Sequence, residues 1–178
     1  MPDYNANIAP FINIIFYVTG EYGVERPTHT HVGLDIATSS PQDLFSMLDG
    51  RVYDKGYTPV RGYYIIIKGN SGLAFLYQHL ESASPLNIGD SVEVNQYVGR
   101  EGNTGESTGL HLHLEIQDLS NREWNFANDI SYYQNPATFM GIPNQYGISA
   151  IYDGIPKYKN KTSKKWLQAK VRRINIRI

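Results

Sequence analysis

Four of the five histidines in this 178-residue chain, together with one aspartate, are spaced like the residues of a metal site. His31 has Asp35 four residues further on, His79 stands alone, and His111 and His113 are one residue apart. Because the chain contains no cysteine, nitrogen and oxygen would have to hold any metal, and imidazole and carboxylate are the zinc ligands that remain. Three protein ligands with an open fourth position would make such a site catalytic rather than structural.

Spacing by itself leaves alternatives open. His29 lies two residues before His31 and competes with it as a ligand. A lone histidine such as His79 is more often a surface or packing residue than a catalytic one, and pairs spaced like His31 and Asp35 arise by chance. The His-x-His pair is the more specific signal.

The segment that carries this pair, Leu110–Ile116, alternates strictly between apolar and polar residues. On a β-strand this pattern places His111, His113 and Glu115 on one face and four aliphatic side chains on the other, buried face. The two histidines would therefore lie on a rigid element with room between them for an ion or a substrate.

The residues around His31 show the same alternation, with aliphatic residues at positions 32, 34 and 36. In a fully extended strand, however, His31 and Asp35 would lie about 13 Å apart at roughly 3.3 Å per residue. That is a long reach for two ligands of one ion. The sequence therefore predicts that the chain bends near Gly33 or that His31 precedes the strand.

A β-hairpin is predicted from Tyr63–Lys68, a Gly-Asn-Ser-Gly turn and Leu73–Gln78. Its second strand would end close to His79, and Phe75, Tyr77 and His79 would share one of its faces.

Short strands separated by turn residues are predicted along most of the chain, with few short helices. The expected fold class is mainly β, with antiparallel pairing favoured by the short connections. Further strands are predicted at Phe11–Val18, Val32–Ala37, Leu44–Tyr53 and Ser91–Val94, and helices only near Asn135–Met140 and Lys164–Arg172.

Charge divides the chain into an acidic body and a basic tail. Residues 1–150 carry seven Lys and Arg against sixteen Asp and Glu, whereas residues 151–178 carry nine against one. Nucleic-acid binding by the body is therefore not expected, while the tail could contact an anionic partner. Pro and Gly punctuate the chain from Gly141 onward, so we expect one domain at 1–140 and a basic C-terminal extension at 141–178.

No membrane span is expected, because the longest apolar run, Phe11–Val18, has eight residues and is interrupted by Asn13. The start of the chain, Met1-Pro2-Asp3, lacks the basic residues and cleavage site of a signal peptide.

Over most of residues 16–140 the sequence resembles the lysostaphin-like (LytM-type) zinc endopeptidases, which cut peptidoglycan cross-links. Residues 18–23 resemble the opening strand of that family, and Asn135-Pro136 stands where its domain usually closes. The matching motifs, in order, are His31-Val32-Gly33-Leu34-Asp35, Asp49-Gly50-Arg51-Val52, Tyr77-Gln78-His79-Leu80, Asn87-Ile88-Gly89-Asp90-Ser91-Val92 and Gly105-Glu106-Ser107-Thr108-Gly109-Leu110-His111-Leu112-His113-Leu114-Glu115.

This resemblance implies one zinc ion per chain with His31, Asp35 and His113 as ligands. It implies that His79 and His111 are catalytic histidines and that His29 has no part in the site. It also implies a groove with the zinc site at its floor and loops as walls. Two residues depart from the family pattern without touching the ligands: Leu110 replaces the usual Pro and Leu114 the usual Phe.

The function implied is a zinc metalloendopeptidase that hydrolyses peptide cross-links of bacterial peptidoglycan, outside the cell at the wall. The alternative is a non-catalytic peptidoglycan-binding or activator module, although all five functional positions are filled. The missing signal peptide and the basic tail are expected if the chain belongs to a larger assembly, such as a phage tail, or to a longer secreted polypeptide.

Overall fold

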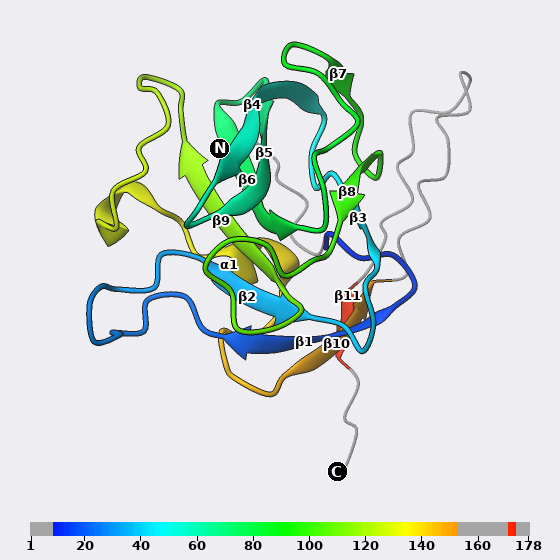
Figure 1. Ribbon diagram of the computed structural model, residues 1–178, viewed down its shortest axis with the longest axis vertical. Coiled ribbons are helices and arrows are strands. Elements are labelled where there is room, and N and C mark those ends of the chain that lie inside the picture. Colours follow the sequence, from blue (N-terminus) through cyan, green and yellow to red (C-terminus); the bar gives the residue numbers. More distant parts are fainter. Residues whose placement is uncertain (1–8, 153–170, 174–178) are drawn as a thin grey trace.

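In the computed structural model, which describes residues 9–152 and 171–173, most of the chain forms antiparallel β-sheet (Figure 1). Nine of the described strands make one sheet in the order β11-β10-β1-β2-β9-β6-β5-β4-β7, and β3 pairs with β8 in a small second sheet. The strands of the large sheet are β1 (Ile15–Gly20), β2 (Leu34–Ala37), β4 (Gly50–Thr58), β5 (Gly62–Gly69), β6 (Leu73–Leu80), β7 (Ser91–Val92), β9 (Leu112–Asp118), β10 (Ser149–Tyr152) and β11 (Val171–Arg173). The small sheet consists of β3 (Asp43–Phe45) and β8 (Tyr97–Arg100).

The predicted hairpin is confirmed as β5 and β6, and the predicted antiparallel pairing holds for every described strand pair. Gly72 closes the turn by donating its N–H to the carbonyl of Gly69 at 3.1 Å, with a φ of 95° that favours glycine.

The main hydrophobic core lies on one face of the large sheet. Alternation sends Leu34 and Ile36 of β2 and Leu112, Leu114 and Ile116 of β9 into this core, where each is fully buried. Asp35 and His113 come between them in the two strands and therefore point to the opposite face. Burial of aliphatic side chains, at about 1.5–3 kcal/mol each, thus fixes which face carries the polar residues.

A short helix, α1 (Pro136–Met140), covers the core face. Asn135 caps it by accepting a hydrogen bond from the N–H of Ala137 at 2.9 Å, and Gly141 ends it in the left-handed conformation. The predicted helix at Asn135–Met140 is therefore confirmed to within one residue. A 3₁₀ turn, η1 (Ile130–Tyr132), precedes it.

Several predicted strands have different bounds, and the one predicted at Ser91–Val94 ends at Val92. The strand predicted at Phe11–Val18 begins only at Ile15, because Asn13 has a φ of 56° and cannot continue a strand. Leu44–Tyr53 divides between β3 and β4, since Leu44 pairs with β8 and residues 50–58 pair with β5. The strand predicted at Val32–Ala37 begins at Leu34.

Strands β8 and β10 were not predicted from the sequence. Of the helix predicted at Lys164–Arg172, residues 164–170 lie outside the described residues, and Val171 and Arg172 belong to β11. The domain boundary at residue 140 stays a prediction; beyond it, β10 pairs with β1 in the large sheet. Within the described ranges, no helix has the length and apolar character needed to span a membrane.

Candidate metal centre and adjoining histidines

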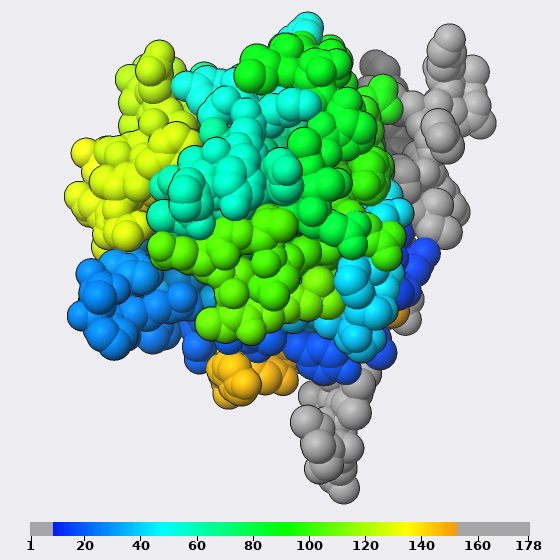
Figure 2. Space-filling model, viewed as in Figure 1, coloured from blue at the N-terminus to red at the C-terminus, as the bar shows by residue number. Residues whose placement is uncertain are grey.

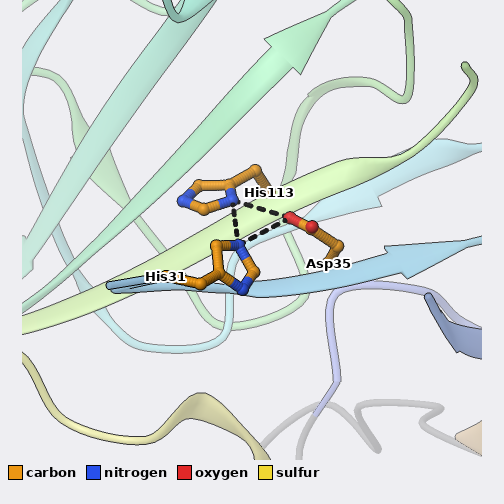
Figure 3. A group of neighbouring side chains, drawn as sticks. All are labelled: His31, Asp35 and His113. Atoms are coloured by element: carbon orange, nitrogen blue, oxygen red, sulfur yellow. Dashed lines mark hydrogen bonds and ion pairs between the residues drawn. The ribbon is translucent and has the colours of Figure 1, made fainter. Parts of the chain in front are cut away.

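Three of the predicted site residues meet on the polar face of the large sheet. Asp35 and His113 are direct partners in the pairing of β2 with β9, and His31 reaches the same point from just before β2. The imidazole rings and the carboxylate point toward one another (Figure 3). Their ligand atoms all lie within 4.8 Å of one another.

The separations of these three atoms suit the coordination of a single ion. His31 Nε2 lies 3.1 Å from His113 Nδ1 and 3.2 Å from Asp35 Oδ1, and His113 Nδ1 lies 2.7 Å from Asp35 Oδ1. Zinc ligands are about 2.0–2.2 Å from the ion, so the ligand atoms of a tetrahedral site are roughly 3.3 Å apart.

The bend expected near Gly33 is confirmed, and His31 precedes the strand. Both features bring His31 within reach of Asp35. Glycine is needed at two points here, because a Cβ at Gly33 would collide with the His113 ring and a Cβ at Gly20 would collide with the Asp35 carboxylate. The glycine of the His-x-Gly-x-Asp motif therefore leaves the space that the His113 ring occupies.

Hydrogen bonds on the outer side of the His31 and His113 rings determine the tautomer of each ring, and therefore which nitrogen has a lone pair. His31 Nδ1 lies 2.6 Å from the carbonyl oxygen of Glu21, and His113 Nε2 lies 3.0 Å from Glu115 Oε1. Because these oxygens only accept, each of these nitrogens carries the hydrogen. The remaining lone pairs of His31 Nε2 and His113 Nδ1 then converge with Asp35 Oδ1. Three electron pairs directed at one point fit a bound cation.

The electrostatics of the cluster agree with this arrangement. Burial by itself would raise the pKa of Asp35, but hydrogen bonds with His113 and His31 outweigh it and hold that pKa well below its usual range. Burial lowers the pKa of His113, yet hydrogen bonds to Asp35 and Glu115 raise it to about 9. In the absence of a cation, a second proton on His113 therefore supplies the positive charge that the carboxylates attract.

Arg26 and Glu21 take part in the cluster although sequence reasoning did not single them out. Arg26 Nη2 donates to Asp35 Oδ2 at 2.8 Å, which leaves Asp35 Oδ1 for the cluster. Glu21 contributes only its backbone carbonyl. No residue pattern reports a backbone contact, and Arg26 reaches Asp35 because the segment before His31 folds back on itself through a bridge between Glu25 and Thr30.

The other two predicted histidines lie beside the cluster. The His79 and His111 ring centroids are 4.7 Å apart, and the His79 and His113 centroids are 6.0 Å apart. His111 Nε2 lies 3.8 Å from Asp35 Oδ1, and its Nδ1 faces the carbonyl oxygen of Gly109 at 2.9 Å. His111 therefore carries a hydrogen on Nδ1 and turns its Nε2 toward the cluster.

His79 shows the same pattern on the other side. Its Nδ1 lies 2.8 Å from the carbonyl oxygen of Thr104, which requires the hydrogen on Nδ1 and leaves a lone pair on Nε2. Burial lowers the pKa of His79 to about 4, only partly offset by the hydrogen bond to Thr104. The ring is therefore neutral near pH 7 and able to accept a proton.

The prediction that Phe75, Tyr77 and His79 share a face is wrong. Phe75 and Tyr77 belong to the hydrophobic core, whereas His79 lies among the histidines on the opposite face. The pairing of β5 with β6 contains a bulge, and His79 has a φ of 61°. This extra residue interrupts the alternation, so that His79 follows Gln78 onto the polar face.

The strand prediction for Leu110–Ile116 is largely confirmed. Leu112, Leu114 and Ile116 are buried in the core and His113 and Glu115 lie on the other face, while Leu110 precedes β9 and is only half-buried. His31 lies in the cluster, whereas the Nδ1 of His29 contacts the hydroxyl of Thr28 at 3.0 Å.

Several connections surround these residues on one side of the molecule. Figure 2 shows the connection from β8 to β9 (bright green) near the centre of the view, below the β4–β5 hairpin (teal), with the β1–β2 connection (blue) at the lower left. Two imidazoles and a carboxylate around one point, with two further histidines beside them on an antiparallel sheet, form a donor set that could hold a single metal ion.

The chain belongs to peptidase family M23, whose family model matches residues 29–125. This range contains all five predicted site residues. The resemblance to lysostaphin-like enzymes and the mainly β, antiparallel fold class expected from the sequence are therefore confirmed.

The chain is similar to two endopeptidases whose names give different specificities. It is 35% identical over 86 residues to the peptidoglycan DD-endopeptidase ShyB of Vibrio cholerae, covering 48% of this chain and 20% of that protein. It is 29% identical over 126 residues to the glycyl-glycine endopeptidase ALE-1 of Staphylococcus capitis, covering 70% and 33%. The chain thus spans between a fifth and a third of the length of these curated relatives.

Among solved structures, the catalytic domain of the antimicrobial peptidase lysostaphin from Staphylococcus simulans resembles this fold. The TM-score is 0.57 with 27% identity, and the match covers 71% of this chain and 91% of that domain.

Proposed function

We propose that this protein is a zinc-dependent endopeptidase that hydrolyses peptide cross-links of bacterial peptidoglycan, with His31, Asp35 and His113 as the zinc ligands. The observation that carries this proposal is the convergence of His31 Nε2, His113 Nδ1 and Asp35 Oδ1 within 2.7–3.2 Å of one another. Two imidazoles and a carboxylate form a known catalytic zinc ligand set that leaves one position open. When bound, zinc supplies a water of lowered pKa and polarises a peptide carbonyl.

The proposed catalytic residues are His79 and His111. Each carries its hydrogen on Nδ1, so each can accept a proton at Nε2. One would take the proton from the attacking water as the C–O bond forms. The other would stabilise the oxyanion or protonate the amine that leaves as the C–N bond breaks.

Peptidoglycan as the substrate is supported by the relatives, which include a DD-endopeptidase and a glycyl-glycine endopeptidase. Action at the cell wall, outside the cell, follows from this substrate. The names of the two relatives give different bonds, and the cleavage products identify the one that this chain cuts. Use of the basic residues 141–178 to join a larger assembly, such as a phage tail, remains a prediction that a search for the chain in purified virions would test.

The proposal is tested by digesting purified, cross-linked peptidoglycan with the protein and identifying new chain ends by mass spectrometry. We expect cleavage that stops with a chelator and returns with added zinc. Release of a new D-Ala carboxyl end would indicate a DD cross-link, and release of glycyl ends would indicate a glycine bridge. Sedimentation with the wall material without new ends, in zinc-loaded protein, would contradict catalysis and favour the binding-module alternative.

A further inference from the structure

The connection between β8 and β9 contacts the start of β5 and the end of β6, at the open end of this hairpin. It also contacts both histidines outside the cluster. Within it, the carbonyl oxygens of Thr104 and Gly109 accept hydrogen bonds from His79 Nδ1 and His111 Nδ1 at 2.8 and 2.9 Å. This one segment therefore sets the ring orientation of both residues proposed to move protons.

Thr104 also forms hydrogen bonds with both strands at the bulge beside His79. Its hydroxyl accepts a hydrogen bond from the N–H of Tyr63 at 3.0 Å and donates one to the carbonyl of Leu80 at 2.6 Å. Tyr63 and Leu80 face each other across β5 and β6 beyond the bulge. The hydroxyl thus connects a backbone donor of β5 with a backbone acceptor of β6 beside the bulge.

This bulge turns His79 toward the cluster. Non-glycine residues adopt a positive φ at a cost of roughly 1–3 kcal/mol, and they keep it only where the surrounding structure enforces it. At His79 the enforcing contacts are the hydrogen bond from its N–H to the carbonyl of Arg61 at 3.0 Å and the two contacts of its neighbours with Thr104.

Close backbone packing leaves Thr104 little freedom to shift. A Cβ at Gly62 would collide with Thr104, and a Cβ at Gly105 would collide with the backbone nitrogen of Gly62. Both glycines have a positive φ, of 63° and 79°. The β8–β9 connection is therefore in direct backbone contact with the start of β5.

We infer that Thr104 is a positioning residue for His79. Its side chain stabilises the bulge that presents the ring, and its carbonyl keeps the ring hydrogen on Nδ1 so that the Nε2 lone pair is available. This inference rests on the proposed function for the role of His79 in turnover, but the geometry it describes is independent of zinc and substrate.

The test compares Thr104→Val, which removes the hydroxyl at nearly constant shape, with Thr104→Ser, which keeps it. The matched control is Thr108→Val in the same connection, because Thr108 is exposed and its hydroxyl has no hydrogen-bond partner within residues 9–152. We expect Thr104→Val to lower kcat by about 10- to 100-fold, as small misplacements of catalytic groups do, with KM within about twofold. Thr104→Ser and Thr108→Val should stay within about twofold of the parent protein, and all three should retain zinc.

A second readout does not depend on activity. In zinc-free protein, two-bond ¹H–¹⁵N spectra distinguish the Nδ1–H and Nε2–H forms of His79, whose signals are assigned by their loss in His79→Gln. We expect the Nδ1–H form in the parent, Thr104→Ser and Thr108→Val proteins, and a mixture of both forms in Thr104→Val. If Thr104→Val does not fold, Thr104→Cys replaces it with the same expectations.

An unchanged His79 tautomer together with unchanged kcat in Thr104→Val would overturn the inference while leaving the proposed function intact. The opposite outcome is a changed His79 tautomer in Thr104→Val together with a parent protein that cleaves no peptidoglycan. In that case the positioning role would stand and the proposed catalytic function would fail.

Discussion

The His31–Asp35–His113 cluster and the His79–His111 pair are neighbours, but the chain positions them by different means. Asp35 and His113 face each other across two paired strands, and the side chains of the cluster contact one another directly. The pair depends on carbonyl oxygens of the β8–β9 connection and, for His79, on a bulge. A sheet is a rigid support, whereas a connection and a bulge can change without loss of the sheet.

This difference implies that metal retention and turnover are separable. Changes to the cluster should abolish both, changes to the pair or its supports should affect turnover alone, and changes to groups that only orient the ligands should weaken metal binding by degrees.

The largest expected effect is from Asp35→Ala. It removes one proposed ligand and leaves His31 and His113 without the carboxylate that they share, so we expect loss of stoichiometric zinc and of all peptidoglycan cleavage. Zinc is measured by mass spectrometry of the metal after dialysis. His29→Ala, which changes a histidine outside the cluster, is the control and should keep both properties. A zinc-replete Asp35→Ala protein would contradict the ligand assignment.

Next in size is His111→Ala. Because His111 contacts the cluster only at 3.8 Å, zinc content should remain that of the parent protein, while kcat falls by roughly 10²–10⁴-fold, the usual contribution of a proton-transfer group. The initial rate of cross-link cleavage reports this. Full activity in this variant would remove His111 from the catalytic pair.

A smaller effect is expected at Glu115, which accepts hydrogen bonds from His113 and, at 2.5 Å, from Gln78. Its loss in Glu115→Ala frees the His113 ring and should weaken zinc affinity by about 10- to 100-fold, as is typical for groups that orient a metal ligand. Competition with a chromophoric chelator measures the affinity. Glu123→Ala, at an exposed carboxylate, provides the control; equal affinities in the two variants would show that Glu115 does not orient His113.

The smallest effect should come from Arg26→Ala. Arg26 Nη2 and Asp35 Oδ2 are in direct contact at 2.8 Å, but the arginine side chain is 39% exposed. Exposed ion pairs contribute little to stability. We expect zinc affinity to fall by no more than about fivefold, and less at high salt. A fall as large as that of Glu115→Ala would place Arg26 among the residues on which the cluster depends.

Local patterns accounted for much of the fold, whereas the choice of His31, Asp35 and His113 as the members of the cluster rested on the family resemblance. Alternation along residues 110–116 predicted which side chains of β9 are buried, and the distance between His31 and Asp35 predicted either a bend near Gly33 or a position of His31 before the strand. Both follow from the fixed geometry of an extended chain. The helix at α1 was predictable because Asn135, Pro136 and Gly141 are its own start and stop signals.

Strand partners and backbone contacts were not predictable in this way. The division of residues 44–53 between two sheets depends on β8 and β5, which are distant in sequence. The hydrogen bonds to the carbonyls of Glu21, Thr104 and Gly109 depend on backbone atoms, which are the same at every residue.

The sequence by itself determined the donor set of this protein: imidazole and carboxylate without thiolate, on an alternating strand whose aliphatic face must be buried. Only the tertiary structure decided where His79 points, because the face of a strand residue follows from alternation until a bulge interrupts it. That bulge is stabilised by Thr104, which lies 25 residues further along the chain, and no pattern local to residue 79 reports such a contact.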